Sequence, residues 1–130
     1  MFGPQWLTAR PIAHRGLHDL AAGVVENTAS AFEAAIAGRY AIETDVQISA
    51  DGEAMVHHDD ALGRLTEGMG RLAELSAAQI KSIQFKATAD RILTLGELLD
   101  LVAGRATLTE TSDLPAARCR CLPATAARWR

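Results

Sequence analysis

Ile42-Glu43-Thr44-Asp45-Val46 is the segment that decides the predicted fold and site of this chain. It lies inside a strand predicted over residues 40–49, and its two acids are two positions apart. Side chains at positions i and i+2 of a strand point to the same face of the sheet, so Glu43 and Asp45 should project together. Two acids on one face repel each other and lose hydration unless a cation or a base lies between them. The segment therefore predicts a ligand-binding strand, with a solvated edge strand as the alternative.

Two other polar groups follow predicted strands. His14-Arg15-Gly16 follows the apolar residues 11–13, and His57-His58-Asp59 closes a strand predicted over residues 53–58. Carboxylates suit Mg²⁺ or Ca²⁺, a guanidinium group suits a phosphate, and histidines transfer protons near neutral pH. Together these groups favour cleavage of a phosphodiester over peptide or sugar chemistry.

Helix signals alternate with the strand signals. A helix predicted over residues 27–37 can be capped by Asn27 or Thr28, and two capping boxes, at Ser76 and Thr94, open helices predicted over residues 77–83 and 95–103. Strands that alternate with helices predict an α/β architecture.

Composition describes one soluble globular domain, with 130 residues, 48% hydrophobic and 22% charged. The net charge of −3 gives no electrostatic footprint for nucleic acid, and no apolar run is long enough to span a membrane. The N-terminus lacks the basic and apolar regions of a secretory signal, so we expect a cytoplasmic protein. Cys119 and Cys121 predict neither an intrachain disulfide nor a zinc site, because of their C-x-C spacing and the lack of a second ligand pair nearby.

The order and spacing of these motifs resemble the glycerophosphodiester phosphodiesterase family, within the phosphatidylinositol phospholipase C-like phosphodiesterase superfamily. The resemblance extends over about residues 10–108. It rests on seven segments: Ile12–Gly16, Glu26–Thr28, Ala31–Ala35, Ile42–Val46, Ala50–Gly52, Val56–Arg64 and Ile92–Leu99.

The resemblance implies a (β/α)₈ barrel whose site lies at the C-terminal ends of its strands. In the family's pattern, His14 and His58 are the acid/base pair, Arg15 holds the substrate phosphate, and Glu43 and Asp45 bind a divalent cation, Mg²⁺ or Ca²⁺. The substrate implied is a small glycerophosphodiester, cleaved to glycerol 3-phosphate and an alcohol such as choline or ethanolamine. The choice of alcohol, of cation and of the histidine that starts as base stays open, as does the oligomeric state.

Three further residues have supporting roles. Asp59 can orient His58, while Glu26 and Asn27 begin a helix whose N-terminus can help to hold phosphate. His57 is predicted to be a structural neighbour of the site. His18 is predicted to be a loop residue, with a position at the substrate mouth as the less favoured alternative.

The chain departs from the family's pattern after Leu108. The family's third metal carboxylate matches Glu110 only doubtfully, because Glu110 comes one position early and a shift of one residue turns a strand side chain to the opposite face. A barrel of this type takes roughly 250 residues. We therefore expect residues 1–108 to be the N-terminal portion of such a domain, in an incomplete barrel. Residues 109–130 should be an irregular tail, consistent with a truncated or frameshifted reading frame.

Three functions are compatible with these observations. The first is a metal-dependent phosphodiesterase, and the second is a catalytically inactive truncated fragment of such an enzyme. A third, a His/Asp metallohydrolase on another α/β scaffold, would require a transition metal held mainly by histidines, whereas the acids here favour Mg²⁺ or Ca²⁺.

Overall fold

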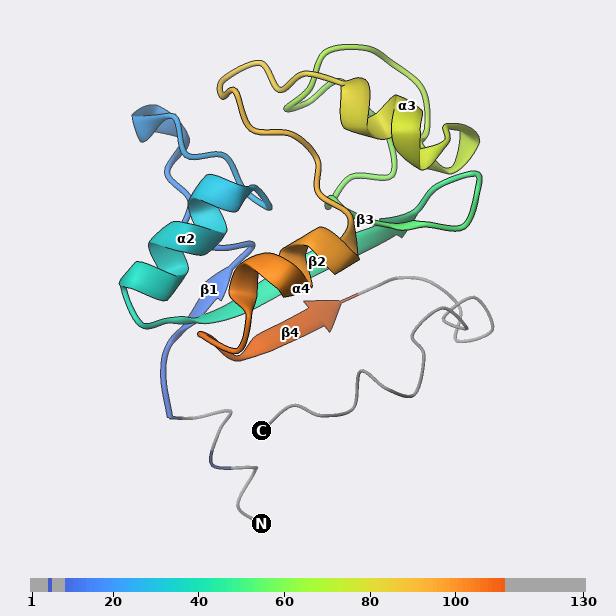
Figure 1. The fold of residues 1–130 in the computed structure, drawn as a ribbon. Coiled ribbons are helices and arrows are strands. Elements are labelled where there is room, and N and C mark those ends of the chain that lie inside the picture. The colour runs from blue at the N-terminus through green and yellow to red at the C-terminus, as the bar shows by residue number, and fades with distance from the viewer. Residues whose placement is uncertain (1–4, 6–8, 112–130) are drawn as a thin grey trace.

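A four-stranded sheet forms the centre of the computed structural model, which describes residue 5 and residues 9–111. The middle strand is β2 (Ala41–Ile48). Both β1 (Ile12–His14) and β4 (Leu108–Thr111) pair with it in parallel, and β3 (Ala54–Val56) pairs antiparallel with its second half. Residues 42 and 43 of β2 have partners on both β1 and β4, so these two strands lie on its opposite edges (Figure 1).

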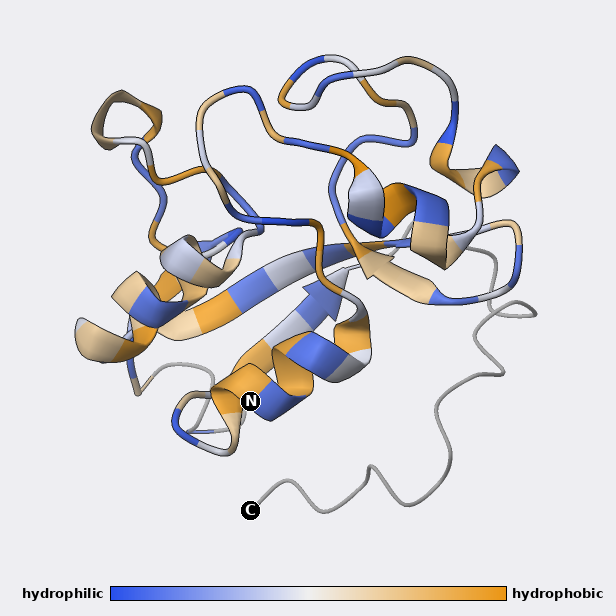
Figure 2. Cartoon of the chain, turned by 45° about the horizontal axis from the view of Figure 1, so that its top comes forward, coloured by the Kyte–Doolittle hydropathy of each residue, from blue (hydrophilic) through white to orange (hydrophobic). Residues whose placement is uncertain are grey.

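Two helices provide the crossover connections that parallel strands require. The helix α2 (Ala29–Ala37) connects β1 to β2, and α4 (Leu95–Val102) leads from β3 to β4. Figure 2 shows both apolar and polar residues along α4, as expected for a helix with one face against a sheet. The helices share one core with the sheet, formed by Ala13, Phe32, Ala35, Ile42, Val56, Leu98 and Val102.

A second, smaller core lies beneath the segment between β3 and α4. This segment contains the 3-10 helix η2 (Leu72–Glu74) and the helix α3 (Ala77–Ser82); another 3-10 helix, η1 (Leu20–Ala22), follows β1. The second core consists of Val25, Met55, Leu72, Ile80, Phe85 and Ile92. It fixes the long loop that follows β3 and thereby the residues after Val56.

The predicted α/β class is confirmed, and the predicted elements are present with small shifts at their ends. Helix α2 begins at Ala29, because Asn27 has a φ of 55° and Thr28 is the cap. Both predicted capping boxes form. Strand β4 extends to Thr111, so three residues assigned to the tail from the sequence continue the sheet. The rest of the tail, including Cys119 and Cys121, lies outside the described residues. None of the described helices is long and apolar enough to cross a membrane.

Candidate active site

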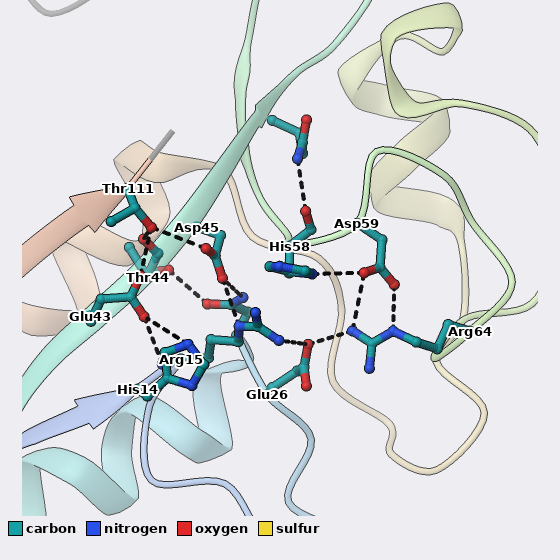
Figure 3. A network of polar contacts seen from close by, with 12 residues as sticks. His14, Arg15, Glu26, Glu43, Thr44, Asp45, His58, Asp59, Arg64 and Thr111 are labelled. Atoms are coloured by element: carbon teal, nitrogen blue, oxygen red, sulfur yellow. Dashed lines mark hydrogen bonds and ion pairs between the residues drawn. The ribbon is translucent and has the colours of Figure 1, made fainter. Parts of the chain in front are cut away.

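The C-terminal ends of β1 and β4 lie beside the middle of β2, and this arrangement brings the predicted site residues together (Figure 3). The register pairs His14 with Glu43, Glu43 with Thr109, and Asp45 with Thr111. Residues paired across a parallel sheet project from the same face. The two acids of β2 therefore share their face with residues from both neighbouring strands.

Glu43 and Asp45 converge on one hydroxyl group. Thr111 Oγ1 lies 2.7 Å from Glu43 Oε1 and 3.1 Å from Asp45 Oδ1. A hydroxyl group has one proton and can donate it to only one of these oxygens at a time. The other carboxylate oxygen then faces an oxygen lone pair, an arrangement that a cation among the three oxygens would relieve. The donor set fits a hard divalent cation, which prefers carboxylate and other oxygen ligands.

Arg15 contacts both acids at the carboxylate oxygens that do not face Thr111. Its backbone N–H donates to Glu43 Oε2 at 3.1 Å, and its Nη1 donates to Glu26 Oε1 at 3.1 Å. Its Nε lies 3.0 Å from Asp45 Oδ2 as an ion pair, but the buried Nε–H makes no hydrogen bond to any described group, because it is not directed at the carboxylate. The guanidinium group is thus held by the hydrogen bond from Nη1 and by ion pairs with Glu26 and Asp45, while Nη2 makes no hydrogen bond to the described residues.

The turn that positions Arg15 is strained. Arg15 has a φ of 58° and the next residue, Gly16, a φ of 78°, both in the left-handed region. A side chain at Gly16 would meet Ala31 at 2.8 Å, so only glycine allows the turn to pack against α2. Left-handed backbone at a non-glycine residue costs about 1 kcal/mol and occurs preferentially at functional sites.

The buried side chain of Asn27 forms hydrogen bonds with two residues of β2. It is 1% exposed, and its Nδ2 donates to Asp45 Oδ2 at 3.1 Å while its Oδ1 accepts from Thr44 Oγ1 at 2.8 Å. Its backbone N–H donates to the Arg15 carbonyl oxygen at 2.9 Å. Asn27 therefore joins the turn after β1 to the acidic strand, a more specific role than beginning a helix.

Arg64 connects this cluster to the end of β3. Its Nη2 donates to Glu26 Oε1 at 2.6 Å, and its Nε donates to Asp59 Oδ2 at 2.6 Å. Burial by itself raises the pKa of Glu26, but Arg64 and Arg15 outweigh it and lower that pKa overall. The pKa of Asp59 is likewise lowered, because bonds from Arg64 and His58 exceed the opposing effect of burial. Both carboxyl groups are thus held ionised at neutral pH.

His58 is oriented by its neighbour in the sequence. Its Nδ1 lies 2.8 Å from Asp59 Oδ1. An ionised carboxylate only accepts hydrogen bonds, so Nδ1 carries the proton and Nε2 of the neutral ring has a free lone pair. Gln47 Nε2 donates to the His58 carbonyl oxygen at 2.8 Å. An open pocket of about 650 Å³ lies here, lined by Gln47, His58, Asp59, Asp60, Ala61, Leu62 and Arg64.

The other two histidines differ in their surroundings. His57 is 3% exposed and its ring contacts the ring of Phe85, with centroids 6.4 Å apart. Burial lowers the pKa of His57, because it disfavours the charged form of the ring. His18 is exposed, and its charge contributes to the lowered pKa of Glu26. His57 is a buried neighbour of the site, as its sequence context suggests.

Glu110 does not join the two acids of β2. The register pairs it with Thr44, which places it on the opposite face from Glu43 and Asp45, as its early position in the sequence predicts. Within residues 9–111, no group of three or more His, Cys, Asp or Glu side chains is arranged to hold a metal ion. Any cation bound here would therefore depend on Glu43 and Asp45 and on a donor of another kind.

The structure places every other predicted site residue in one polar network. Ion pairs and hydrogen bonds run without a break through His14, Glu43, Thr111, Asp45, Arg15, Glu26, Arg64, Asp59 and His58, and Asn27 joins at Asp45. Sequence reasoning missed Thr111, Thr44 and Gln47, and it gave no role to Arg64. For Gln47 a signal was available, since it is at position i+4 from Glu43 on the same strand face.

Comparison with known proteins shows which proteins the chain is similar to. A family model described as the glycerophosphoryl diester phosphodiesterase family matches residues 14–117, beyond the boundary predicted at residue 108. A glycerophosphodiester phosphodiesterase of Caldanaerobacter subterraneus subsp. tengcongensis is 38% identical over 101 residues, which are 72% of this chain and 40% of the relative. Glycerophosphodiester phosphodiesterase 1 of Homo sapiens is 39% identical over 74 residues, 55% of this chain and 21% of the relative.

Solved structures show the same relationship. A glycerophosphoryl diester phosphodiesterase from Parabacteroides distasonis aligns with a TM-score of 0.73 at 26% identity, over 84% of this chain and 40% of that one. An Oleispira antarctica phosphodiesterase, solved in complex with the product sn-glycerol-3-phosphate, aligns with a TM-score of 0.69 at 28% identity, over 82% of this chain and 46% of that one. The chain therefore spans less than half the length of these proteins, and its fold is that of part of a (β/α)₈ barrel, as predicted.

Proposed function

Because this chain belongs to the glycerophosphoryl diester phosphodiesterase family, we propose that its site hydrolyses a small glycerophosphodiester to glycerol 3-phosphate and an alcohol. The observation that carries the proposal is the single network that gathers two imidazoles, two guanidinium groups and four carboxylates at neighbouring strand ends (Figure 3). The complex of the Oleispira relative with sn-glycerol-3-phosphate supports the substrate class.

The proposal includes a divalent cation, Mg²⁺ or Ca²⁺, held by Glu43 and Asp45. The four carboxylates of the network face only two guanidinium groups, so the network keeps an excess of negative charge even when His14 is protonated. Bound there, the ion would supply Lewis-acid neutralisation of the phosphate oxygens. The donor chemistry and the excess of negative charge both support this assignment.

The side chains of the chain would bind the substrate and move its protons. Arg15 would hold the phosphate through the edge of the guanidinium group that carries Nη2. His58, with its proton on Nδ1, would accept at Nε2 the proton of the attacking water or of a neighbouring substrate hydroxyl. His14, which is exposed and 3.9 Å from Glu43 Oε2, would give its proton to the departing alkoxide. When water attacks, the new P–O bond forms as the bond to the alcohol breaks, and the two protons balance. When a neighbouring substrate hydroxyl attacks, the same exchange gives a cyclic phosphodiester, and water then opens its ring with the two histidines in exchanged roles to yield glycerol 3-phosphate.

The test is the release of glycerol 3-phosphate from glycerophosphocholine, measured with Mg²⁺ or Ca²⁺ and again after chelation. We expect turnover that requires the cation and falls at least about 100-fold in His14→Ala and His58→Ala, the usual scale of a proton-transfer residue. His18→Ala is the matched control, because His18 is an exposed histidine outside the chain of bonds, and it should retain turnover. Equal turnover in all three variants would contradict the assigned roles.

A non-catalytic chain that keeps the ligand residues is the second candidate. It is favoured by the position of Glu110, which leaves the described site with two acids beside a neutral hydroxyl. Folded protein that binds cation but releases no glycerol 3-phosphate would select this candidate.

A further inference from the structure

We propose that Thr111 is the third donor of the cation site, in the position that an acid would otherwise occupy. The site would then consist of two carboxylates and one hydroxyl, and it would bind a divalent cation more weakly than a site of three acids. This inference rests on the cation of the proposed function, but it concerns binding and is tested without substrate.

The register of β4 is the first argument. Thr111 pairs with Asp45 across the parallel ladder, so its side chain projects from the same face as Asp45 and Glu43. Glu110 pairs with Thr44 and projects from the other face. A shift of one residue exchanges the two faces of a strand completely, so no small adjustment brings Glu110 to the acids.

The positions of the oxygens are the second argument. Thr111 Oγ1 lies 2.7 Å from Glu43 Oε1, 3.1 Å from Asp45 Oδ1 and 3.5 Å from the Thr44 carbonyl oxygen. All three neighbours are acceptors, and the hydroxyl group has one proton for them. A cation replaces the missing donors, because it draws on the lone pairs of the hydroxyl and of both carboxylates together.

The remaining carboxylate oxygens are already occupied. Glu43 Oε2 accepts from the backbone N–H of Arg15 at 3.1 Å, and Asp45 Oδ2 accepts from Asn27 Nδ2 at 3.1 Å. The outer oxygens are therefore fixed by protein donors, while the inner oxygens, Oε1 and Oδ1, both point to Thr111. This division leaves one side of each carboxylate for a shared ligand.

The experiment measures Mg²⁺ and Ca²⁺ binding by calorimetry in the wild-type chain and four variants. Thr111→Val keeps the shape and strand preference of threonine and should weaken binding about fivefold, since one oxygen donor is lost. At least one of Thr111→Glu and Thr111→Asp should tighten binding by about tenfold or more, because the number of charged ligands sets the affinity of such sites. The matched control, Glu110→Gln, removes the adjacent acid and should leave the affinity unchanged.

Two results would overturn the inference. One is weaker binding in Glu110→Gln with no change in the Thr111 variants, which would place Glu110 at the site. The other is equal binding, or none, in all five proteins, which would remove Thr111 from any cation site. Circular dichroism of each variant shows that the fold is retained. A chain that binds cations as predicted but fails to release glycerol 3-phosphate would refute the proposed catalysis and leave the role of Thr111 intact.

Discussion

Replacing Asn27 with alanine should destabilise the protein by about 3–4 kcal/mol, more than most single substitutions. Asn27 is 1% exposed, accepts a hydrogen bond from Thr44 at 2.8 Å and donates one to Asp45 at 3.1 Å. The loss leaves a buried Thr44 hydroxyl without its acceptor, which costs about 1–2 kcal/mol, and removes a bond to a carboxylate worth about 1 kcal/mol. Alanine at a φ of 55° adds about 1 kcal/mol of backbone strain.

The backbone and side-chain contributions can be separated with a second variant. Asn27→Gly loses the same two hydrogen bonds, but glycine adopts a positive φ without strain. We therefore expect Asn27→Gly to cost about 1 kcal/mol less than Asn27→Ala. Thr44→Val completes a double-mutant cycle with Asn27→Ala, and the coupling energy should be about 1 kcal/mol because the two residues share one bond.

The assay is urea unfolding followed by circular dichroism, in the presence of a chelator so that bound cations do not contribute to the free energy of unfolding. A cost below about 1 kcal/mol for Asn27→Gly would refute the hydrogen-bond argument. Equal costs for the alanine and glycine variants would refute the backbone argument. An additive cycle would show that Asn27 and Thr44 act independently.

Three further changes test other parts of the structure. Arg64→Gln should lower the free energy of unfolding by about 1–2 kcal/mol at neutral pH, discounted for a half-exposed side chain. The pKa values of its two partners, Glu26 and Asp59, are lowered in the folded chain. Their contribution to the free energy of unfolding is therefore present above the unfolded pKa of about 4 and is lost as the pH falls through the folded pKa values. The difference between Arg64→Gln and wild type should vanish in acid. Gly16→Ala should lower the free energy of unfolding by about 2–4 kcal/mol, measured by thermal unfolding, because it adds a 2.8 Å contact with Ala31 to the strain of a positive φ. Gly52→Ala is the control: Gly52 has a φ of 85° and no atom within 4 Å, so this variant should show the backbone strain alone. Burial lowers the pKa of His57 in the folded chain. Below the ordinary pKa of 6.5, the unfolded chain therefore binds a proton at His57 more strongly than the folded chain does, and stability falls as the pH is lowered. The melting temperature of wild type should therefore drop between pH 7.5 and 5.5; His57→Gln should reduce this drop and His18→Gln should not.

Much of the site could be predicted from the sequence because it depends on local periodicity. Glu43 and Asp45 share a face by the two-residue repeat of a strand, and a strand end carries His14 and Arg15 into the same region. The same repeat predicts that Glu110 lies on the opposite face of the sheet from these two acids. These features need no knowledge of distant contacts.

The remaining features depend on contacts between residues far apart in the sequence. Thr111 meets Glu43 across 68 positions, and its role depends on which residue of β4 faces Asp45. Arg64 reaches Glu26 across 38 positions from a long loop held by the second core. No periodic pattern within one segment encodes either contact. The helix start also shifted for a tertiary reason, because Asn27 leaves the helix to bind β2.

Backbone strain and charge repulsion occur together at this site. The non-glycine residues with positive φ include Arg15 and Asn27, and each donates to one of the two acids of β2. Glu43 and Asp45 in turn face each other across a hydroxyl that can satisfy only one of them. The acids thus stabilise the strained turn while they repel each other, and an added cation would relieve the repulsion without breaking the bonds from the turn. A ligand that binds only this folded arrangement stabilises it by mass action, about 2.7 kcal/mol at one hundred times its dissociation constant. Folding and cation binding would therefore be coupled through Arg15, Asn27, Glu43 and Asp45, and a cation between the two acids would raise the stability of the folded chain.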